Sequence, residues 1–419
     1  MSSEDLANLV KQRYREMVDS GADPQQWSFA WRTEANKGGF KSVDFLMREI
    51  VDTGKCIGCA ACVVTCPVDV FDYKDEKPQD TRNDACVYCE LCVDVCPVLR
   101  PPDKELPALL GYKAPVSDEG FGPYHQAFIA RSKIEKIRAK GQDGGVVTTL
   151  LTFALEKGYI KGAIIGDVSK TNPQIPMQKL ATSSEDLLLG SASRYTYSPN
   201  TVALADALTR DVKPIAVVGV PCQIDGTRHL QYPGIELKMA EWFRKNILFT
   251  VGLFCSEAFT HDSIDALSKS VNIDPKEIEN INVKGKVILR LQDKREVIVS
   301  LEEMRKYARP ACLYCIDYAA DSSDIGVGGI GLNGWAFTVV RTEIGAKIFN
   351  EAVREGWVET RPVEEEPRSK KLLIRLSKSK RSRPLPALMP TLQERKEKGN
   401  LDPKAFETGS HINPPKKEN

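Results

Sequence analysis

The sequence predicts an α/β domain with a mixed sheet, preceded by a small α+β domain that is rich in cysteine. Eight of the 12 cysteines lie in two short runs, at 56–67 and 86–97. From about residue 125 to residue 360, apolar runs alternate with stretches of helical spacing, which is typical of an α/β fold. We therefore divide the chain into a charged leader (1–50), the cysteine-rich domain (51–110), a linker (111–124), the α/β domain (125–360) and a basic, proline-containing tail (361–419).

The composition is that of a globular protein. Hydrophobic residues make up 42% of the 419 residues, which is enough for packed cores. The formal net charge of +1 gives no global attraction to nucleic acid. No apolar run reaches the roughly 20 residues of a membrane span, and the first residues lack the apolar segment of a signal peptide. We therefore expect a cytoplasmic protein, either free or peripheral at the inner face of the membrane, with no nucleic-acid partner.

The two ends of the chain carry weaker patterns. Apolar residues have helical spacing in the leader, so we expect it to be partly helical. Beyond them, Trp27, Phe29 and Trp31 alternate, and they either pack on the chain itself or form a docking surface. The segment "RSKKLLIRLSKSKRSR" contains basic residues and no acid, and prolines follow it. This pattern predicts a poorly ordered tail.

Each cysteine run has the spacing C-x2-C-x2-C-x3-C-P. This is the spacing of a bacterial two-cluster ferredoxin. Three cysteines so spaced wrap a loop around one face of a [4Fe–4S] cluster, whereas the fourth lies too far along the chain and binds the other cluster. The predicted ligand sets are Cys56, Cys59, Cys62 and Cys96 for one cluster, and Cys86, Cys89, Cys92 and Cys66 for the other.

Disulfides and zinc are the alternatives for these cysteines. A long, charged chain without an export signal is expected in a reducing compartment, which argues against disulfides. Zinc sites use paired C-x2-C knuckles rather than three evenly spaced cysteines and a fourth before proline. Gly58 would let the backbone pass close to a cluster, and Pro67 and Pro97 would turn the chain after each run.

The α/β domain is predicted from its strands and helices in chain order. The glycine loop "GQDGG" at 141–145 opens a helix that ends near Gly158. Further helices are expected around 200–210, 262–271 and 343–355. The segments "VILRL" and "EVIVS" predict a hairpin, and hence a mixed sheet. Buried strands are predicted at "YIKGAIIG", "PIAVVG" and "NILFTVGLFC".

Four cysteines remain, and two of them follow predicted strands. Cys222 and Cys255 come after such strands, and the carboxyl ends of strands in α/β sheets converge on the ligand crevice. Cys312 and Cys315 form a C-x2-C pair. Together they make a third [4Fe–4S] site plausible. A structural zinc site and four buried free thiols are the alternatives.

The loop "GQDGG" is the best candidate for binding an anion or a flat ring, because glycine amides and a following helix N-terminus favour negative charge. A glycine-rich turn without a ligand is the alternative. The segment "GVGGIG" at 326–331 precedes the predicted strand "WAFTVV" rather than a helix, so it is not a Rossmann fingerprint. The four histidines are scattered along the sequence and suggest no catalytic group.

Five segments together resemble the beta subunits of coenzyme F420-reducing hydrogenase and of F420-dependent dehydrogenases. They follow one another between about residues 125 and 350: "GQDGGVVTTLL", "GVPCQIDG", "GLFCSEAF", "RPACLYCIDYAAD" and "DIGVGGIG". With a two-cluster ferredoxin in front, the chain is most similar to the F420H2-oxidising subunits of membrane oxidoreductase complexes. The leader and the tail lie outside the resemblance.

The resemblance implies that the α/β domain binds FAD and a [4Fe–4S] cluster and that F420 docks against the flavin. The implied cluster ligands are Cys222, Cys255, Cys312 and Cys315. The implied flavin contacts are Gly141, Gln142, Asp143, Gly144, Gly145 and Thr148, with Arg194, Tyr195 and Ser198 nearby.

The implied function follows from the chemistry of these cofactors. F420 transfers two electrons as hydride and clusters take one, so a flavin, which does both, has to stand between them. We expect an F420-dependent oxidoreductase in which electrons move between F420 and one-electron carriers through FAD and three clusters, with no catalytic side chain. The partners would be other subunits of a redox complex or a soluble carrier. A ferredoxin-linked reductase of a pigment-type substrate and a non-catalytic electron-wiring subunit are the alternatives.

Overall fold

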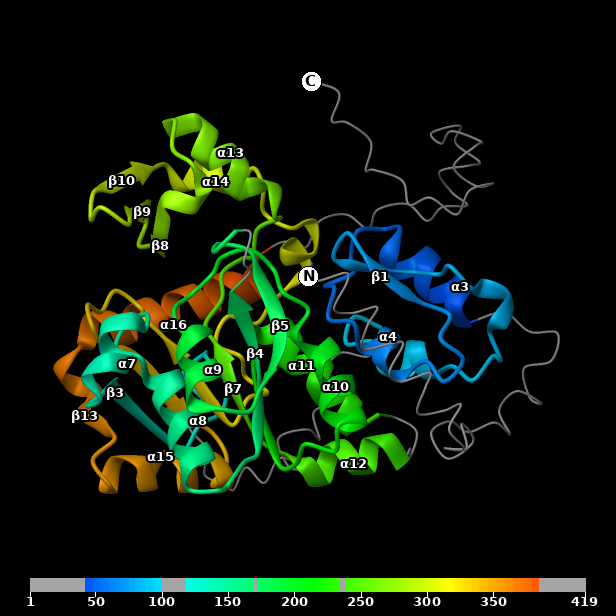
Figure 1. Ribbon diagram of the computed structural model, residues 1–419, viewed down its shortest axis with the longest axis horizontal. Helices are drawn as coiled ribbons and strands as arrows, with labels where there is room; N and C mark the ends of the chain where they lie inside the picture. The colour runs from blue at the N-terminus through cyan, green and yellow to red at the C-terminus, as the bar shows by residue number, and fades with distance from the viewer. Residues whose placement is uncertain (1–41, 100–117, 169–171, 234–237, 384–419) are drawn as a thin grey trace.

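The computed structural model describes residues 42–99, 118–168, 172–233 and 238–383, and Figure 1 shows their arrangement. The small cysteine-rich domain lies beside a large sheet with helices on both of its faces. A second, smaller sheet with two short helices lies at one end of the large one (Figure 1). The predicted helix and aromatic residues of the leader fall outside the described residues, as do the first half of the linker and the tail beyond residue 383.

The large sheet is mixed, as the sequence predicts. Its strand order is β13-β3-β12-β11-β7-β6-β4-β5. The neighbours β4, β6, β7 and β11 are parallel, and every other pairing in the sheet is antiparallel. The three strands predicted from apolar runs are β4, β6 and β7. The bounds are β3 (Gln126–Ser132), β4 (Gly162–Val168), β5 (Pro176–Ala181), β6 (Ile215–Gly219), β7 (Ile247–Leu253), β11 (Ile325–Gly328), β12 (Ala336–Val340) and β13 (Val358–Pro362).

Helices cover both faces because the central strands are apolar on both sides. In β6, Ile215 and Val217 join one core, whereas Ala216 and Val218 join the other. Within the described residues, no helix has the length and apolar character of a membrane span. The helices are α7 (Glu135–Lys140), α8 (Val146–Glu156), α9 (Ser184–Leu189), α10 (Ala203–Thr209), α11 (Pro221–Gln231), α12 (Lys238–Asn246) and α15 (Glu343–Arg354).

The first part of the predicted tail is ordered, which differs from the expectation. Residues 358–362 form the edge strand β13, and α16 (Pro367–Ser382) packs on the sheet. Leu373 is fully buried in a core with Ile129 of β3 and Phe337 of β12. The reason lies in the spacing of the apolar residues of α16, which recur on one face of the helix between the basic ones. The high density of positive charge masks this amphipathic pattern in the sequence.

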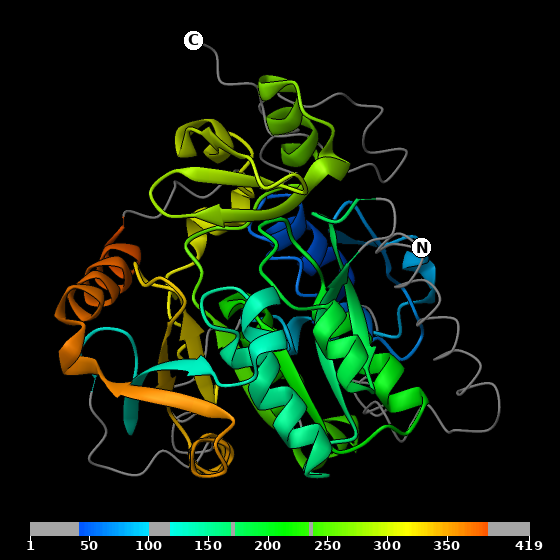
Figure 2. The same cartoon turned by 60° about the vertical axis from the view of Figure 1, so that its left-hand side comes forward.

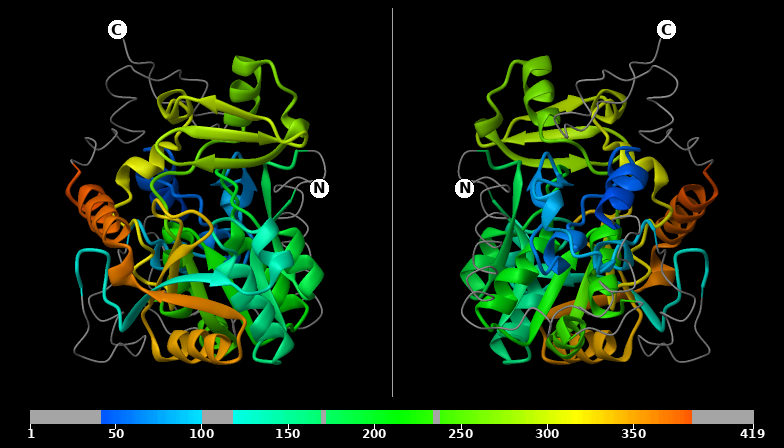
Figure 3. Two further views of the ribbon diagram at one scale, coloured as in Figure 1. Left: turned by 90° about the vertical axis from the view of Figure 1, so that its left-hand side faces the viewer. Right: turned by 90° about the vertical axis from the view of Figure 1, so that its right-hand side faces the viewer.

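The predicted hairpin is confirmed, but it belongs to a separate sheet. Strands β8 (Ile278–Val283), β9 (Val287–Leu291) and β10 (Glu296–Val299) pair antiparallel. They share their own core with α13 (Asp262–Val271) and α14 (Leu301–Arg305). Figures 2 and 3 show this small sheet above one end of the large sheet. The large sheet is therefore mixed because of its own outer strands and not because of the hairpin.

The cysteine-rich domain begins earlier than residue 51. Helix α3 (Ser42–Leu46) and the π-helical turn η2 (Met47–Val51) bury Val43, Leu46 and Ile50 in the same core as the cysteine runs. These ten residues are therefore part of the domain rather than of a leader. The remaining elements are α4 (Ala61–Thr65), β1 (Asp72–Lys74), β2 (Lys77–Gln79), η3 (Asn83–Ala85) and α5 (Leu91–Asp94).

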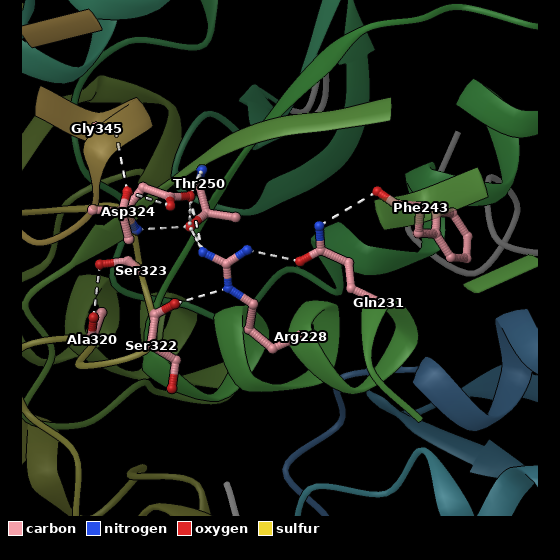
Figure 4. Close-up of polar contacts among 10 residues, drawn as sticks. Arg228, Gln231, Phe243, Thr250, Ala320, Ser322, Ser323, Asp324 and Gly345 are labelled. Carbon is pink, nitrogen blue, oxygen red and sulfur yellow. Dashed lines mark hydrogen bonds and ion pairs between the residues drawn. The ribbon is translucent and has the colours of Figure 1, made fainter. Parts of the chain in front are cut away.

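A buried ion pair holds α11 against the large sheet (Figure 4). Arg228 Nη2 lies 2.9 Å from Asp324 Oδ2, and the two side chains are only 4% and 5% exposed. Arg228 also donates a hydrogen bond to the carbonyl of Ser322, and Asp324 accepts one from the amide of Thr250 in β7. These bonds tie the last turn of α11 to β7 and to the residues just before β11, so they fix the helix against the sheet.

We expect Arg228→Met to lower the free energy of unfolding by about 3–5 kcal/mol, because it leaves Asp324 charged and unpaired in the core. The matched control is Arg290→Met. Arg290 pairs with Glu296 at 2.7 Å, with side chains 57% and 48% exposed, and such pairs contribute about 0–1 kcal/mol. Urea unfolding followed by circular dichroism measures both changes. Equal destabilisation by the two substitutions would contradict the role given to the buried pair.

Candidate functional site

The two cysteine runs adopt the same backbone conformation. Gly58 and Tyr88 occupy matching positions with φ of 72° and 59°, and Ala60 and Glu90 match with φ of 61° in both. Residues other than glycine avoid this left-handed region, which costs roughly 1–2 kcal/mol per residue. Left-handed and right-handed residues in succession turn neighbouring amides toward one side, as in many anion and iron–sulfur sites. The repeated strain therefore fits two loops that each surround an anionic cluster.

The structure brings together the cysteines that the spacing assigns to the first cluster. Burial raises the pKa of Cys62, and the anionic forms of Cys59, Cys56 and Cys96 raise it further. Cys96, the last cysteine of the second run, therefore lies among three cysteines of the first run. We call Cys56, Cys59, Cys62 and Cys96 the proximal quartet.

The second predicted set is assembled in the same crossed way. Burial raises the pKa of Cys92, and the anionic form of Cys66 is the next largest cause of that rise. Burial raises the pKa of Cys89 to about 12, and Cys66 and Cys86 add to it. We call Cys66, Cys86, Cys89 and Cys92 the distal quartet. Cys92 also raises the pKa of Cys62, so the two quartets are neighbours.

The remaining four cysteines also meet, although they come from three separate segments. Cys222 lies in the first turn of α11, directly after β6, and Cys255 follows β7. Cys312 and Cys315 lie in and after the 3-10 turn η6 (Pro310–Tyr314). Burial raises the pKa of Cys222, and Cys315, Cys255 and Cys312 each raise it further. The carboxyl ends of β6 and β7 therefore converge as the sequence predicts, and we call these four the α/β quartet.

The chemistry of these thiols fits iron–sulfur clusters. All twelve are free. Burial, first among the causes, raises the pKa of Cys96 and of Cys255 to about 12, so thiolates need positive charge beside them. Across the part of the chain that the structure describes, no three Cys, His, Asp or Glu side chains converge closely enough to hold a single metal ion. The ligand role of each cysteine, and the choice between iron–sulfur clusters and zinc, stay predictions.

The loop Gly141–Gly145 curls tightly before α8. Asp143, Gly144 and Gly145 have φ of 39°, 91° and 70°. The first amides of α8 have no acceptor within the helix, and the N-cap residue Gly145 has no side chain to cap them. Asp143 pairs with Lys284 of the small sheet at 3.3 Å, so its charge is balanced. The loop can therefore receive a phosphate or the edge of a ring at the helix N-terminus.

Some of the predicted flavin contacts gather at this loop. Gln142 accepts a hydrogen bond from Asn280, and Thr148 is buried in the first turn of α8. Tyr195 accepts a hydrogen bond from the amide of Val283 at 3.2 Å. Burial raises the pKa of Tyr195 to about 12, and the anionic forms of Asp143 and Cys255 contribute to the rise. Tyr195 therefore lies near both Asp143 of the loop and Cys255 of the α/β quartet.

Two predicted contacts have other surroundings. Arg194 donates hydrogen bonds to the carbonyls of Gly190, Ser191 and Ala192, so its guanidinium is occupied in folding its own loop. Ser198 is buried beside α11, where its carbonyl accepts a hydrogen bond from Gln223. The structure brings neither side chain to the glycine loop through a described contact.

A buried arginine that is not among the predicted site residues joins the two domains. Arg309 Nε lies 2.8 Å from Glu76 Oε2, and Arg309 also donates a hydrogen bond to the carbonyl of Ile57 at 2.9 Å. Its guanidinium lies 3.7 Å from the ring centroid of Tyr197. Burial raises the pKa of Tyr197, as do the anionic forms of Cys222 and Cys59, so this ring stands between two quartets. The only signal in the sequence is that Arg309 lies three residues before Cys312.

The proximal quartet touches the helix that carries Cys222. A Cβ atom added to Gly226 of α11 would lie 2.9 Å from Cys59 Cβ and 3.2 Å from its Sγ. The hydroxyl of Thr201 donates a hydrogen bond to the carbonyl of Cys59. The distal quartet instead packs at α12, where Cys89 shares a small core with Ala240. The proximal quartet is therefore the one next to the α/β quartet.

Three family models match the chain. Two of them describe the beta subunit of coenzyme F420 hydrogenase/dehydrogenase: the model of its N-terminal part matches residues 127–205, and the model of its C-terminal part matches residues 212–366. A 4Fe-4S dicluster domain model matches residues 49–100. These matches confirm the resemblance drawn from the five sequence segments and from the cysteine spacing.

Relatives and a solved structure agree with these models. The chain is 33% identical to the beta subunit of coenzyme F420 hydrogenase from Methanosarcina barkeri over 63% of its own length and 91% of that protein. It is 29% identical to the F subunit of the F420H2 dehydrogenase from Methanosarcina mazei, over 72% of this chain and 83% of that one. A chain of the F420-reducing [NiFe] hydrogenase complex from Methanosarcina barkeri superposes with a TM-score of 0.61, at 30% identity, over 72% of this chain and 99% of that chain.

We expect Gly226→Ala to disturb the proximal quartet, because the added methyl group would overlap Cys59. Overpacking of this kind costs about 1–3 kcal/mol, which exceeds the gain of about 1 kcal/mol from helix propensity. The measurement is the EPR spectrum of the reduced, reconstituted protein together with its unfolding midpoint. The control is Gly166→Ala, whose Cβ would lie at an ordinary 3.6 Å from Pro176. The same spectrum and midpoint in both variants would refute the close contact.

Proposed function

Because the chain belongs to the coenzyme F420 hydrogenase/dehydrogenase beta subunit family, we propose that it is an iron–sulfur flavoprotein that moves electrons between coenzyme F420 and one-electron carriers through FAD and three [4Fe–4S] clusters. It would work as an F420-dependent oxidoreductase subunit of a larger complex. The names of its relatives support this proposal, since they include a subunit of an F420 hydrogenase and a subunit of an F420H2 dehydrogenase.

The observation that carries the proposal is the order in which the candidate groups stand. The glycine loop adjoins Tyr195, and Tyr195 adjoins Cys255 of the α/β quartet. Tyr197 lies between Cys222 of that quartet and Cys59 of the proximal quartet. The proximal quartet adjoins the distal one. A single file of this kind suits electron transfer through short steps, and it supports a flavin at the loop end and an electron carrier at the distal end.

The residues of the chain hold and orient these groups, and no side chain has to act as acid or base. When bound, FAD exchanges a hydride with F420 and single electrons with iron–sulfur clusters. Gly144, Gly145 and the open end of α8 would hold a phosphate or the ring edge of the flavin. Tyr195 would cover the space between the flavin and Cys255. Arg309 would keep the ferredoxin loop against η6, so that the proximal quartet stays close to the α/β quartet.

The same arrangement suggests where F420 and the electron partner would bind. F420 carries a phosphate and an acidic tail, so a basic side chain near the flavin is expected. Lys284 lies beside the glycine loop and donates a hydrogen bond to Asn333 at 2.8 Å. The electron partner would be another subunit or a soluble carrier that docks near the distal quartet. We also propose that the protein is cytoplasmic, either free or peripheral at the membrane.

We expect the purified, reconstituted chain to oxidise F420H2 anaerobically with two molecules of a viologen reduced per F420H2, because two electrons leave the donor. NADH is the control donor and should give no reaction. Protein that holds flavin and about twelve irons, as three cubanes require, but does not oxidise F420H2 would contradict the proposal. Activity toward a pigment-type substrate would then favour the alternative reductase, and iron without flavin would favour an electron-wiring subunit.

We expect Gly144→Val to abolish flavin retention while the iron content stays unchanged. The side chain would collide at 2.9 Å with the carbonyl of Gly334 and with Arg131 Cβ, and the backbone φ of 91° disfavours any Cβ. Gly158→Val is the matched control, since Gly158 also has a positive φ of 75° but nothing lies within 4 Å of an added Cβ. The ratio of flavin absorbance to protein concentration in each purified variant measures flavin retention. Equal flavin content in the two variants would argue against the glycine loop as the flavin site.

Paired substitutions test the crossed assignment of the ferredoxin cysteines. Cys66→Ala with Cys89→Ala should remove one cluster and leave about eight irons, because both residues belong to the distal quartet. Cys62→Ala with Cys66→Ala should remove two clusters and leave about four irons, although both lie in the first run. Iron and acid-labile sulfide analysis distinguishes the two cases. The opposite pattern would show that each run forms its own site.

A further inference from the structure

Lys380 is a buried lysine on α16 whose ammonium group reaches the α/β quartet. Its side chain is only 5% exposed. Nζ donates hydrogen bonds to the carbonyl of Cys255 at 2.9 Å and to the carbonyl of Asp317 at 2.7 Å. These two carbonyls belong to the loops that carry Cys255 and Cys315. Helix α16, which lies far along the sequence from Cys255 and Cys315, therefore places Lys380 beside the loops that carry both cysteines.

The charge of Lys380 faces the thiols. Burial alone would lower the pKa of Lys380, but the anionic forms of Cys255 and Cys315 outweigh it and leave that pKa raised. The effect is mutual, since burial raises the pKa of Cys315 and Lys380 counteracts the rise. Among the described residues, Lys380 forms no ion pair with a carboxylate, whereas Arg309 on the other side of the quartet is paired with Glu76. The carboxylates of Asp317 and Asp225 also interact with the charge of Lys380, although neither forms a direct ion pair with it among the described residues.

We propose that Lys380 is a positioning residue that raises the reduction potential of the cluster held by the α/β quartet. This inference rests on the proposed function, since it requires that cluster. A [4Fe–4S] cluster with four thiolates gains one negative charge when it accepts one electron. A fixed cation nearby stabilises the reduced form more than the oxidised form, and net charge and hydrogen bonding are known controls of cluster potential. Lys380 keeps its proton throughout, so only the electron moves.

Helix α16 lies outside the segment that the family model for the C-terminal part matches. The family model for the C-terminal part ends at residue 366, and α16 begins at Pro367. The helix packs through Leu373 on the sheet, and Lys380 lies two turns further along the same buried face. Helix α16 therefore brings a positive charge to the loops that carry Cys255 and Cys315. It would favour electron transfer from the flavin into the α/β cluster.

The test is an anaerobic redox titration of the reconstituted chain, in which EPR follows the cluster of the α/β quartet. We expect Lys380→Met to shift its one-electron equilibrium at least tenfold against reduction, which is about 59 mV more negative. Lys380→Arg, which keeps the charge, should remain close to the wild-type value. The matched control is Lys371→Met on the exposed face of the same helix, for which we expect less than a twofold change in the equilibrium.

Each outcome decides the role of Lys380. A cluster with an unchanged or more positive potential in Lys380→Met would overturn the inference and leave the proposed function intact. If Lys380→Met loses the cluster while Lys380→Arg keeps it, the charge itself is required, which supports the inference. Loss of the cluster from both variants would overturn it in favour of a purely structural role. A wild-type chain that holds only two clusters would refute the proposed function at this quartet, and this inference with it.

Discussion

The main constraint on the structure is the burial of cysteine thiols, because burial opposes the negative charge that they would carry as ligands. Burial is the largest cause of the raised pKa at each cysteine for which a shift is resolved. Such sites are stable only if positive charge or backbone dipoles compensate the thiolates. The repeated left-handed residues of the two ferredoxin loops, Arg309 at the domain junction and Lys380 on α16 all meet this requirement. The described cations near the cysteines therefore follow from one electrostatic constraint.

The fold meets that constraint by bringing distant segments to the carboxyl ends of the parallel strands in the large mixed sheet. Strands β6 and β7 end side by side, which places Cys222 and Cys255 together, and the buried Arg228–Asp324 pair holds α11 where Cys222 can join them. The same helix offers Gly226, a residue without a side chain, to the proximal quartet. One helix thus positions a ligand of one quartet and forms the docking surface for another. The distance between the two sites is set by the packing of rigid elements.

The sequence predicted the parts of the site that depend on local spacing. The crossed cysteine quartets follow from the pattern C-x2-C-x2-C-x3-C-P, and the meeting of Cys222 with Cys255 follows from the rule for strand ends. The pairing of Arg309 with Glu76 could not be predicted, because the two residues are far apart in the sequence and lie in different domains. Lys380 lies in a basic segment whose charge density conceals its buried helical face. The hairpin is visible in the sequence, but only tertiary packing decides that it forms a separate core over the glycine loop.

The central claim is the order in which electrons pass through the groups. Removing the cluster of the α/β quartet, which lies in the middle of that path, tests the claim most directly. Cys315→Ala should keep the flavin and about eight irons, which belong to the two ferredoxin clusters. After rapid mixing with F420H2, freeze-quench EPR should show those clusters unreduced while the flavin absorbance bleaches, and dithionite should still reduce them. Reduction of the ferredoxin clusters by F420H2 at the wild-type rate in this variant would contradict the account, because electrons would then bypass the α/β quartet.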